Sequence, residues 1–156
     1  MHGIISLIYF ITLLYILLYF LIIFLYNYSG DIMDCIFDKI VNGDIPSFKL
    51  YEDDLVIAFL DINPSSNGHT LVVPKIHYTD VFDIPNDTLL HIFDVARNLM
   101  NILKEKLNCD GFTLIQNNGI VEEVKYFHLH IKPAYLNEDN LVIRNVEDIY
   151  NIIKTY

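Results

Sequence analysis

The chain has 156 residues, of which 53% are hydrophobic, and this length suits one domain with an additional segment. Its formal net charge of −10 argues against the broad cationic surface that binds a nucleic-acid backbone, so no nucleic-acid partner is expected. The two cysteines do not suggest a disulfide framework, and the domain is expected to be cytoplasmic.

The N-terminal segment is strongly apolar. Residues 4–26 carry no charge and consist almost wholly of Ile, Leu, Phe and Tyr, and a helix of that length would be about 35 Å long, enough to cross a ~30 Å hydrocarbon core. A signal peptide fits less well, because no Lys or Arg precedes Lys39. Two interpretations stay open: residues 1–32 are a single membrane anchor, or the protein begins at Met33 and this tract is translated in error.

Residues 33–156 are expected to form one globular domain, because no repeat or low-complexity linker divides them. Residues 35–41 predict a short helix. Two strands are expected over residues 49–52 and 56–60, joined by an Asp-Asp turn. Residues 69–74 predict a third strand, rich in β-branched side chains.

The strongest periodic pattern predicts a long helix that Asn86 or Asp87 caps. Its apolar side chains recur at helical spacing: Leu89, Phe93, Ala96, Met100, Leu103 and Leu107. Residues 112–116 and 127–132 predict two more strands, and residues 146–154 predict a C-terminal helix. This order predicts an α+β fold with an antiparallel sheet of about five strands, one long helix and one or two short helices, in addition to the hydrophobic N-terminal helix.

Residues 126–133, Tyr-Phe-His-Leu-His-Ile-Lys-Pro, are the most informative stretch. In a strand, His128 and His130 point to one face, roughly 6.5 Å apart, while the apolar residues between and beside them point to the other. Taken alone, such a pair also fits an exposed strand face or half of a metal site. Its context therefore has to decide which kind of site it builds.

Four segments in series resemble the histidine triad (HIT) family of nucleotide hydrolases and transferases, in that family's order. They are Cys-Ile-Phe-Asp-Lys-Ile at 35–40, Gly-Asp-Ile-Pro at 43–46, Asp-Ile-Asn-Pro through Pro-Lys-Ile-His at 61–77, and the histidine strand itself. The resemblance covers residues 33–135 and is to small bacterial HIT proteins. It implies the HIT-like fold and homodimers whose sheets join edge to edge.

The resemblance also implies roles for three histidines. His128 would attack the α-phosphorus of a nucleotide and become a nucleotidyl-histidine, which water then hydrolyses. A neutral imidazole can do this near pH 7, because its ordinary pKa is about 6.5. His130 and His69 would flank the phosphate, hold its oxygens and handle the proton that the leaving group requires.

A nucleoside pocket is implied in the same way. Asp61 matches the carboxylate that binds the ribose hydroxyls, and Asn117 matches an asparagine that contacts ribose or phosphate. The apolar walls around the base would be Phe37, Ile40, Ile45, Phe59 and Ile62. Without the resemblance, the apolar residues are better explained as ordinary core and Asn117 as a turn residue.

The chain departs from the family pattern at the site where many bacterial relatives hold a structural zinc. Tyr126 replaces the first histidine of the triad, and Asp38 replaces the second cysteine of Cys-x-x-Cys. Two of four ligands are therefore lost together, and a phenol with a pKa near 10 is a poor substitute. Cys35, Asp38 and His77 can still hold a metal weakly. We expect no structural zinc.

A second departure concerns the phosphate. Glu122 and Glu123 occupy a shortened loop where relatives carry hydrogen-bond donors, and Ala134 follows Pro133 in place of an arginine. Two carboxylates beside a phosphate repel it unless they point outward or pair with a lysine. Catalysis is therefore expected to be slow or differently specific.

These observations favour a nucleotide hydrolase or nucleotidyl transferase that cleaves a nucleoside phosphoramidate or a dinucleoside polyphosphate, takes a purine nucleotide and needs no cofactor. One alternative is a non-catalytic nucleotide-binding or dimerisation module of the HIT fold. Another is a metal-binding structural protein built on Cys35, His77, His128 and His130. The choice of base and leaving group stays open.

Overall fold

The computed structural model describes residues 14–21, 35–121 and 123–155. The chain divides into two compact units, residues 1–35 and residues 36–156. In the first unit, residues 14–21 are helical and their side chains are exposed. Among the described residues, no helix is both long and apolar enough to cross a membrane. The membrane helix predicted over residues 4–26 therefore has no support there, and most of that segment lies outside the described residues.

The second unit is an α+β domain. Its helices and strands, in chain order, are α2 (Ile36–Asn42), β1 (Lys49–Glu52), β2 (Val56–Leu60), β3 (Thr70–Pro74), α3 (Asn86–Leu107), β4 (Gly111–Ile115), β5 (Leu129–Ala134) and α4 (Val146–Lys154), with two short 3-10 helices at Gly119–Val121 and Glu138–Asn140. The five strands form one antiparallel sheet in the order β1-β2-β3-β5-β4. This confirms the predicted fold class.

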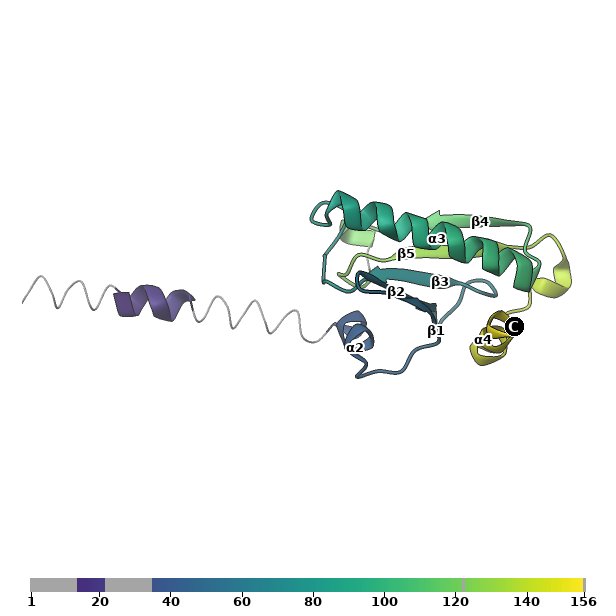
Figure 1. The fold of residues 1–156 in the computed structure, drawn as a ribbon, viewed down its shortest axis with the longest axis horizontal. Helices are drawn as coiled ribbons and strands as arrows, with labels where there is room; N and C mark the ends of the chain where they lie inside the picture. The colour runs from purple at the N-terminus through teal and green to yellow at the C-terminus, as the bar shows by residue number, and fades with distance from the viewer. Residues whose placement is uncertain (1–13, 22–34, 122, 156) are drawn as a thin grey trace, which may run out of the picture. The chain divides into compact units, whose positions relative to one another are not determined.

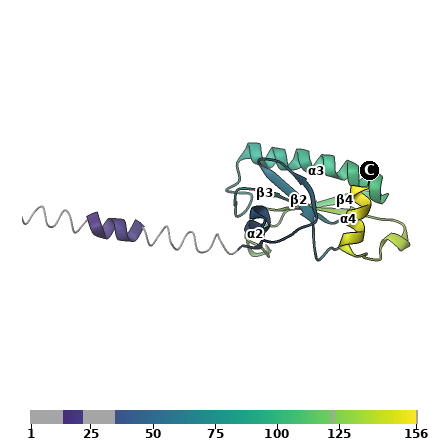
Figure 2. The same cartoon turned by 60° about the horizontal axis from the view of Figure 1, so that its bottom comes forward.

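The hydrophobic core lies between one face of the sheet and the helices α3 and α4. The long helix α3 runs across the sheet (Figures 1 and 2) and contacts β3, β5 and α4. Leu129 and Ile131 of β5 are buried in this core beneath Ile92 and Leu99 of α3. Because side chains alternate along a strand, the residues between them point to the opposite face. That face carries the candidate site.

Strand β2 is buried on both faces, which explains its continuous apolar sequence. Val56 and Ala58 join the core under α3, whereas the ring of Phe59 contacts Phe37 of α2, with 5.9 Å between the ring centroids. Helix α2 therefore covers the face of the sheet that α3 leaves open. Figures 1 and 2 show α2 and α4 at opposite ends of the sheet.

Two predicted details are wrong. Helix α3 is preceded by Pro85, which provides no side-chain cap, and the predicted caps Asn86 and Asp87 lie inside its first turn. Strand β5 begins at Leu129 instead of Phe127, because the Phe127 amide donates to the carbonyl of Tyr78, outside the sheet. Pro133 fits within β5, which continues to Ala134 opposite Gly111.

Candidate active site

Three imidazoles meet on the face of the sheet opposite α3. His69 immediately precedes β3, His128 immediately precedes β5, and His130 lies within β5 opposite Leu71. His69 Nε2 is 2.9 Å from His130 Nδ1, and the ring centroids of His128 and His130 are 4.8 Å apart. The pairing of β3 with β5 therefore brings together side chains that lie 61 positions apart in the chain.

A backbone carbonyl fixes the tautomer of His128. Its Nδ1 lies 2.5 Å from the carbonyl oxygen of Tyr126, and a carbonyl can only accept a hydrogen bond. Nδ1 therefore carries the proton, and Nε2 keeps its lone pair. The ring is only 5% exposed and packs edge-on against Phe37, with 5.2 Å between centroids. His128 is thus a buried imidazole with a nucleophilic nitrogen in a fixed position.

A backbone amide sets the tautomer of His69. The Ser65 N–H donates to His69 Nδ1 at 3.3 Å, so in the neutral ring the proton sits on Nε2. That Nε2–H then donates to His130 Nδ1, which leaves the proton of His130 on its own Nε2. The chain of hydrogen bonds thus makes His130 Nε2 a donor, whereas His128 Nε2 keeps a lone pair.

All three imidazoles are held neutral at pH 7. Burial lowers the pKa of His69 to about 4 and, together with the neighbouring His128 and His69, lowers that of His130 to about 4. Burial also lowers the pKa of His128, although its bond to the Tyr126 carbonyl and the charges of Asp61 and Glu123 oppose this. An anionic phosphate among these rings would favour their charged forms and raise all three pKa values.

Asp61 is the first residue of the loop between β2 and β3. Its amide donates to the carbonyl of His69 at 2.9 Å, and its Oδ1 accepts the amide of Asn63 at 2.9 Å. The other oxygen, Oδ2, lies 3.3 Å from His69 Nδ1, within ion-pair distance. The carboxylate is partly exposed and stands between the imidazoles and the neighbouring apolar cavity.

That cavity measures about 150 Å³ and lies between α2 and the sheet. All five predicted wall residues and Asp61 line it. Further lining residues that the sequence analysis did not single out are Ile36, Pro46, Ser47, Phe48, Leu60 and Leu71. Because Phe37 lines the cavity and also contacts His128, the cavity adjoins that imidazole.

The structure does not bring Asn117 to the imidazoles through any described contact. Asn117 follows β4, and its carbonyl accepts a hydrogen bond from Gln116 Nε2 at 2.6 Å. Of the two glutamates in the shortened loop, Glu122 lies outside the described residues. Glu123 is exposed, and its charge acts on His128.

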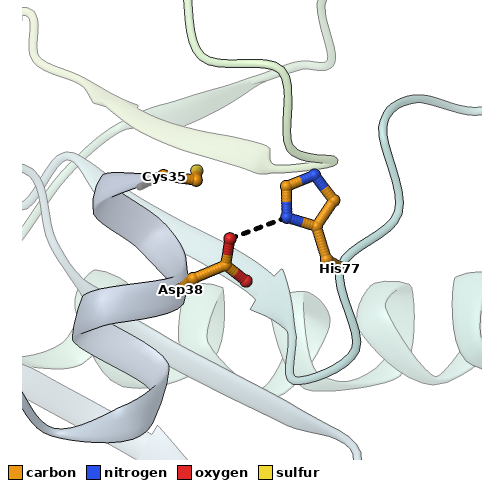
Figure 3. Close-up of side chains that lie close together, drawn as sticks. All are labelled: Cys35, Asp38 and His77. Carbon is orange, nitrogen blue, oxygen red and sulfur yellow. Dashed lines mark hydrogen bonds and ion pairs between the residues drawn. The ribbon is translucent and has the colours of Figure 1, made fainter. Parts of the chain in front are cut away.

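The positions that resemble a zinc site hold a hydrogen-bonded pair. One ligand atom each from Cys35, Asp38 and His77 lies within 4.8 Å of the others, and Figure 3 shows Asp38 of α2 pointing at the His77 ring. Asp38 Oδ2 is 2.8 Å from His77 Nδ1. The phenol of Tyr126 is fully buried and donates to the carbonyl of Pro74 at 2.6 Å. Cys35, Asp38 and His77 thus offer three ligand atoms, whereas a structural zinc site usually has four.

The sequence analysis missed Ser65 and Asn67. Both lie in the polar loop Ser-Ser-Asn-Gly before His69, whose composition indicates a turn and nothing more. The side chain of Asn67 is 5% exposed and binds the backbone of the C-terminal segment. No local pattern in the sequence signals such a contact.

Known proteins share the fold and more than a third of the aligned residues. The family profile described as HIT domain matches residues 42–136. An uncharacterized HIT-like protein of Methanocaldococcus jannaschii is 44% identical, over 77% of this chain and 96% of that protein. An adenosine 5'-monophosphoramidase of Saccharomyces cerevisiae is 38% identical, over 70% of this chain and 68% of that protein. A zinc-bound histidine triad family protein from Mycobacterium smegmatis superposes with a TM-score of 0.70 at 34% identity, covering 78% of this chain and 91% of that one.

Proposed function

Because this chain belongs to the HIT domain family, we propose that it is a nucleotide hydrolase or nucleotidyl transferase that reacts at the α-phosphate of a nucleoside phosphoramidate or dinucleoside polyphosphate. The observation that carries the proposal is the bond from His128 Nδ1 to the Tyr126 carbonyl. It holds the Nε2 lone pair of His128 beside a second imidazole that donates a hydrogen bond.

In the first step, His128 Nε2 attacks the α-phosphorus, and the bond from phosphorus to the leaving amine or phosphate breaks. His130 Nε2–H donates to a phosphate oxygen and stabilises the charge that develops there. The bound anion raises the pKa values of His69 and His130, so this pair can take up a proton and transfer it to the leaving group. In the second step, water attacks the phosphorus, the Nε2–phosphorus bond breaks, and the pair recovers the proton that water loses.

The cavity beside Phe37 is the proposed base site, and its apolar walls fit a purine. Asp61 lies where that cavity approaches the imidazoles, so we assign its carboxylate to the ribose hydroxyls. Asn117 is retained as a ribose or phosphate contact on the resemblance alone. The relative named adenosine 5'-monophosphoramidase makes adenosine 5'-phosphoramidate the first substrate to test. The proposed reaction uses no cofactor.

A second candidate function is a nucleotide-binding module that has lost turnover. The specific observation in its favour is the negative charge of Glu123, which acts on His128 from the loop where a phosphate would need donors. A carboxylate there repels the incoming phosphate but leaves the base cavity intact. Binding without turnover would therefore follow if Glu123 stays unpaired beside the phosphate.

The test is AMP release from adenosine 5'-phosphoramidate and diadenosine polyphosphates by the full chain and by His128→Ala. We expect the substitution to reduce kcat by at least about 10³-fold, because the covalent step loses its nucleophile. His91→Ala is the matched control: this histidine lies on α3 and pairs with Asp53, so activity should be retained. If the full chain and His128→Ala both release no AMP, and calorimetry still detects AMP binding, the chain is a binding module.

A further inference from the structure

We propose that Asn67 is a positioning residue for the reaction: it ties the Ser65–His69 loop to the C-terminal segment and so maintains the tautomer of His69. The inference rests on the proposed function of the imidazoles. It concerns a residue that is itself outside the reacting groups.

The side chain of Asn67 acts as a hydrogen-bonded clamp between two loops. Its Nδ2 donates to the carbonyls of Asn140 and Val142, at 3.0 and 2.9 Å, and its Oδ1 accepts the amide of Arg144 at 2.8 Å. An amide side chain is suited to this, because it offers two donors and an acceptor at one position. A carboxylate would turn an acceptor towards two carbonyls, and an apolar side chain would leave three backbone groups without a partner.

The backbone of the same loop is held by further contacts, in addition to the bonds from the His69 amide to the Ser66 carbonyl and from the Asp61 amide to the His69 carbonyl. The phenol of Tyr135 donates to the carbonyl of Asn67 at 2.7 Å. Gly68 adopts a φ of +84° and packs so closely on α3 that a Cβ there would lie 2.4 Å from Leu107 Cδ1. No helix or strand covers residues 65–69, so these contacts help to fix the position of the loop backbone.

The loop matters because it carries the amide that sets the state of His69. Ser65 N–H reaches His69 Nδ1 only at 3.3 Å, and the Asp61 carboxylate lies at the same distance from that nitrogen. The two neighbours favour opposite arrangements: the amide requires a lone pair on Nδ1, whereas the carboxylate favours a proton there. A small displacement of the loop would therefore favour the tautomer of His69 that carries its proton on Nδ1, beside the Asp61 carboxylate.

The consequence would reach His130. With its proton on Nδ1, His69 would accept at Nε2 from His130 Nδ1–H, and His130 Nε2 would present a lone pair instead of a donor. A lone pair facing a phosphate oxygen is repulsive, so the transition state would lose a hydrogen bond. The C-terminal segment, which contributes no imidazole, thus maintains the donor at His130 through Asn67.

The experiment compares the full chain with Asn67→Asp and with Asn145→Asp. Both substitutions convert an amide into a carboxylate in the same part of the fold. Asn145 uses only its Oδ1, which accepts the amide of Glu147, so a carboxylate there keeps the bond. At position 67 the two donors are lost. The readouts are the ¹⁵N chemical shifts of the histidine ring nitrogens at pH 7 and the separate values of kcat and KM.

We expect the wild type and Asn145→Asp to show an unprotonated Nδ1 and a protonated Nε2 at His69. In Asn67→Asp the proton should move towards Nδ1, and kcat should fall about 100- to 1,000-fold, as for loss of one transition-state hydrogen bond. KM for the nucleotide should change by less than about threefold. Tyr135→Phe removes the hydrogen bond to the Asn67 carbonyl and should produce a smaller change in the same direction. It provides the test if Asn67→Asp does not fold.

A wild-type His69 with a protonated Nδ1 at pH 7 would refute the proposal, as would an Asn67→Asp protein whose ring nitrogens match those of the wild type. A fall in kcat of the same size in Asn145→Asp would also count against it, because the effect would then come from charge alone. The ring-nitrogen shifts need no turnover. An inert wild type with the expected shift pattern would therefore contradict the proposed function but not the positioning by Asn67.

Discussion

At the scale of single residues, backbone groups set the tautomers of His128 and His69, and His69 in turn sets that of His130. A carbonyl next to His128 and an amide next to His69 fix which ring nitrogen carries the proton. Neither backbone group can titrate, so the tautomers of the neutral rings persist across the pH range in which those rings stay neutral. The proposed nucleophile His128 and the proposed donor His130 are therefore distinguished by the hydrogen bonds around them, although both side chains are imidazoles.

The same loop gives a stability prediction at Gly68. Replacing it with alanine places a Cβ 2.4 Å from Leu107 Cδ1 at a φ of +84°, so both a steric clash and an unfavourable backbone conformation are expected. We expect Gly68→Ala to lower the free energy of unfolding by about 1–3 kcal/mol in urea denaturation. Gly111→Ala is the control, because nothing lies within 4 Å of its Cβ position. An equal loss of unfolding free energy in both variants would contradict the close packing of Gly68 on Leu107.

The alternation in Tyr-Phe-His-Leu-His-Ile predicted correctly that His128 and His130 share a face, because this depends only on the local geometry of an extended chain. The roles of Asn67 and Ser65 were not predictable in the same way. The partners of the Asn67 side chain lie at least 73 positions away, and the Ser65 amide has no side chain to identify it. Contacts of this kind become visible only when the fold brings the segments together.

At the scale of elements, helix α2 links the proposed base cavity to His128, the proposed nucleophile. Phe37 is its buried residue, and the ring lies 5.9 Å from Phe59, 5.8 Å from Tyr126 and 5.2 Å from His128. The position of α2 therefore influences both the shape of the cavity and the packing of the imidazole. The pair formed by Asp38 and His77 ties this helix to the segment after β3.

This pair leads to a prediction about zinc. We expect purified protein to contain far less than one zinc per chain, and EDTA to leave its Tm unchanged, because the Tyr126 phenol donates to a carbonyl and offers no ligand in its protonated form. Elemental analysis and thermal unfolding measure both quantities. The double variant Asp38→Cys with Tyr126→His restores the two missing ligand types and should bind one zinc. Stoichiometric zinc in the wild type would contradict the expectation.

Element boundaries show where reasoning from the sequence stops. The periodic pattern located α3, because its buried residues recur at helical spacing from Ile92 to Leu103, although Phe93 of the predicted stripe is exposed. The start of β5 was misplaced by two residues, since the pattern Phe-x-Leu-x-Ile continues beyond the sheet. Phe127 is as buried as a strand residue, but its amide bonds to Tyr78. Burial determines the alternation of apolar residues, whereas hydrogen-bonded pairing determines the residue at which the strand begins.

At the scale of the whole molecule, the two edges of the sheet differ. Strand β1 carries Lys49 and Glu52 and has an irregular register with β2, both of which discourage further pairing. Strand β4, Gly-Phe-Thr-Leu-Ile, contains no charge and exposes Leu114. An uncharged edge strand is a template for another strand. We therefore propose that β4 forms the edge of a homodimer.

The corresponding prediction concerns mass in solution. Light scattering on the eluting protein should give twice the chain mass, and Leu114→Lys should shift it to the monomer, because a buried lysine at a paired edge has no partner. Leu136→Lys is the control, since that leucine is 85% exposed and lies outside β4. A wild-type monomer at micromolar concentration would contradict the dimer, and an unchanged Leu114→Lys dimer would place the interface elsewhere.

The stability of the domain should fall in two stages as the pH falls. His69 and His130 have pKa values lowered to about 4, chiefly by burial, whereas in the unfolded chain they are about 6.5. Between those values the unfolded state binds more protons, so stability decreases as the pH drops from about 6.5 to 4, by at most about 1.4 kcal/mol per pH unit for each histidine.

The second stage comes from Asp53. Burial acts to raise its pKa, but hydrogen bonds from Tyr51, from the Val56 and Leu55 amides and from His91 lower it overall. Its contribution is therefore present above the unfolded value near 3.9 and is lost as the pH falls further. Urea denaturation across this range measures both stages. His130→Gln should reduce the slope only above pH 4, where His69 still contributes, and Asp53→Asn should reduce it only in the stage below. A wild-type stability that is constant from pH 7 to 5 would mean that the imidazoles are not held neutral by the fold.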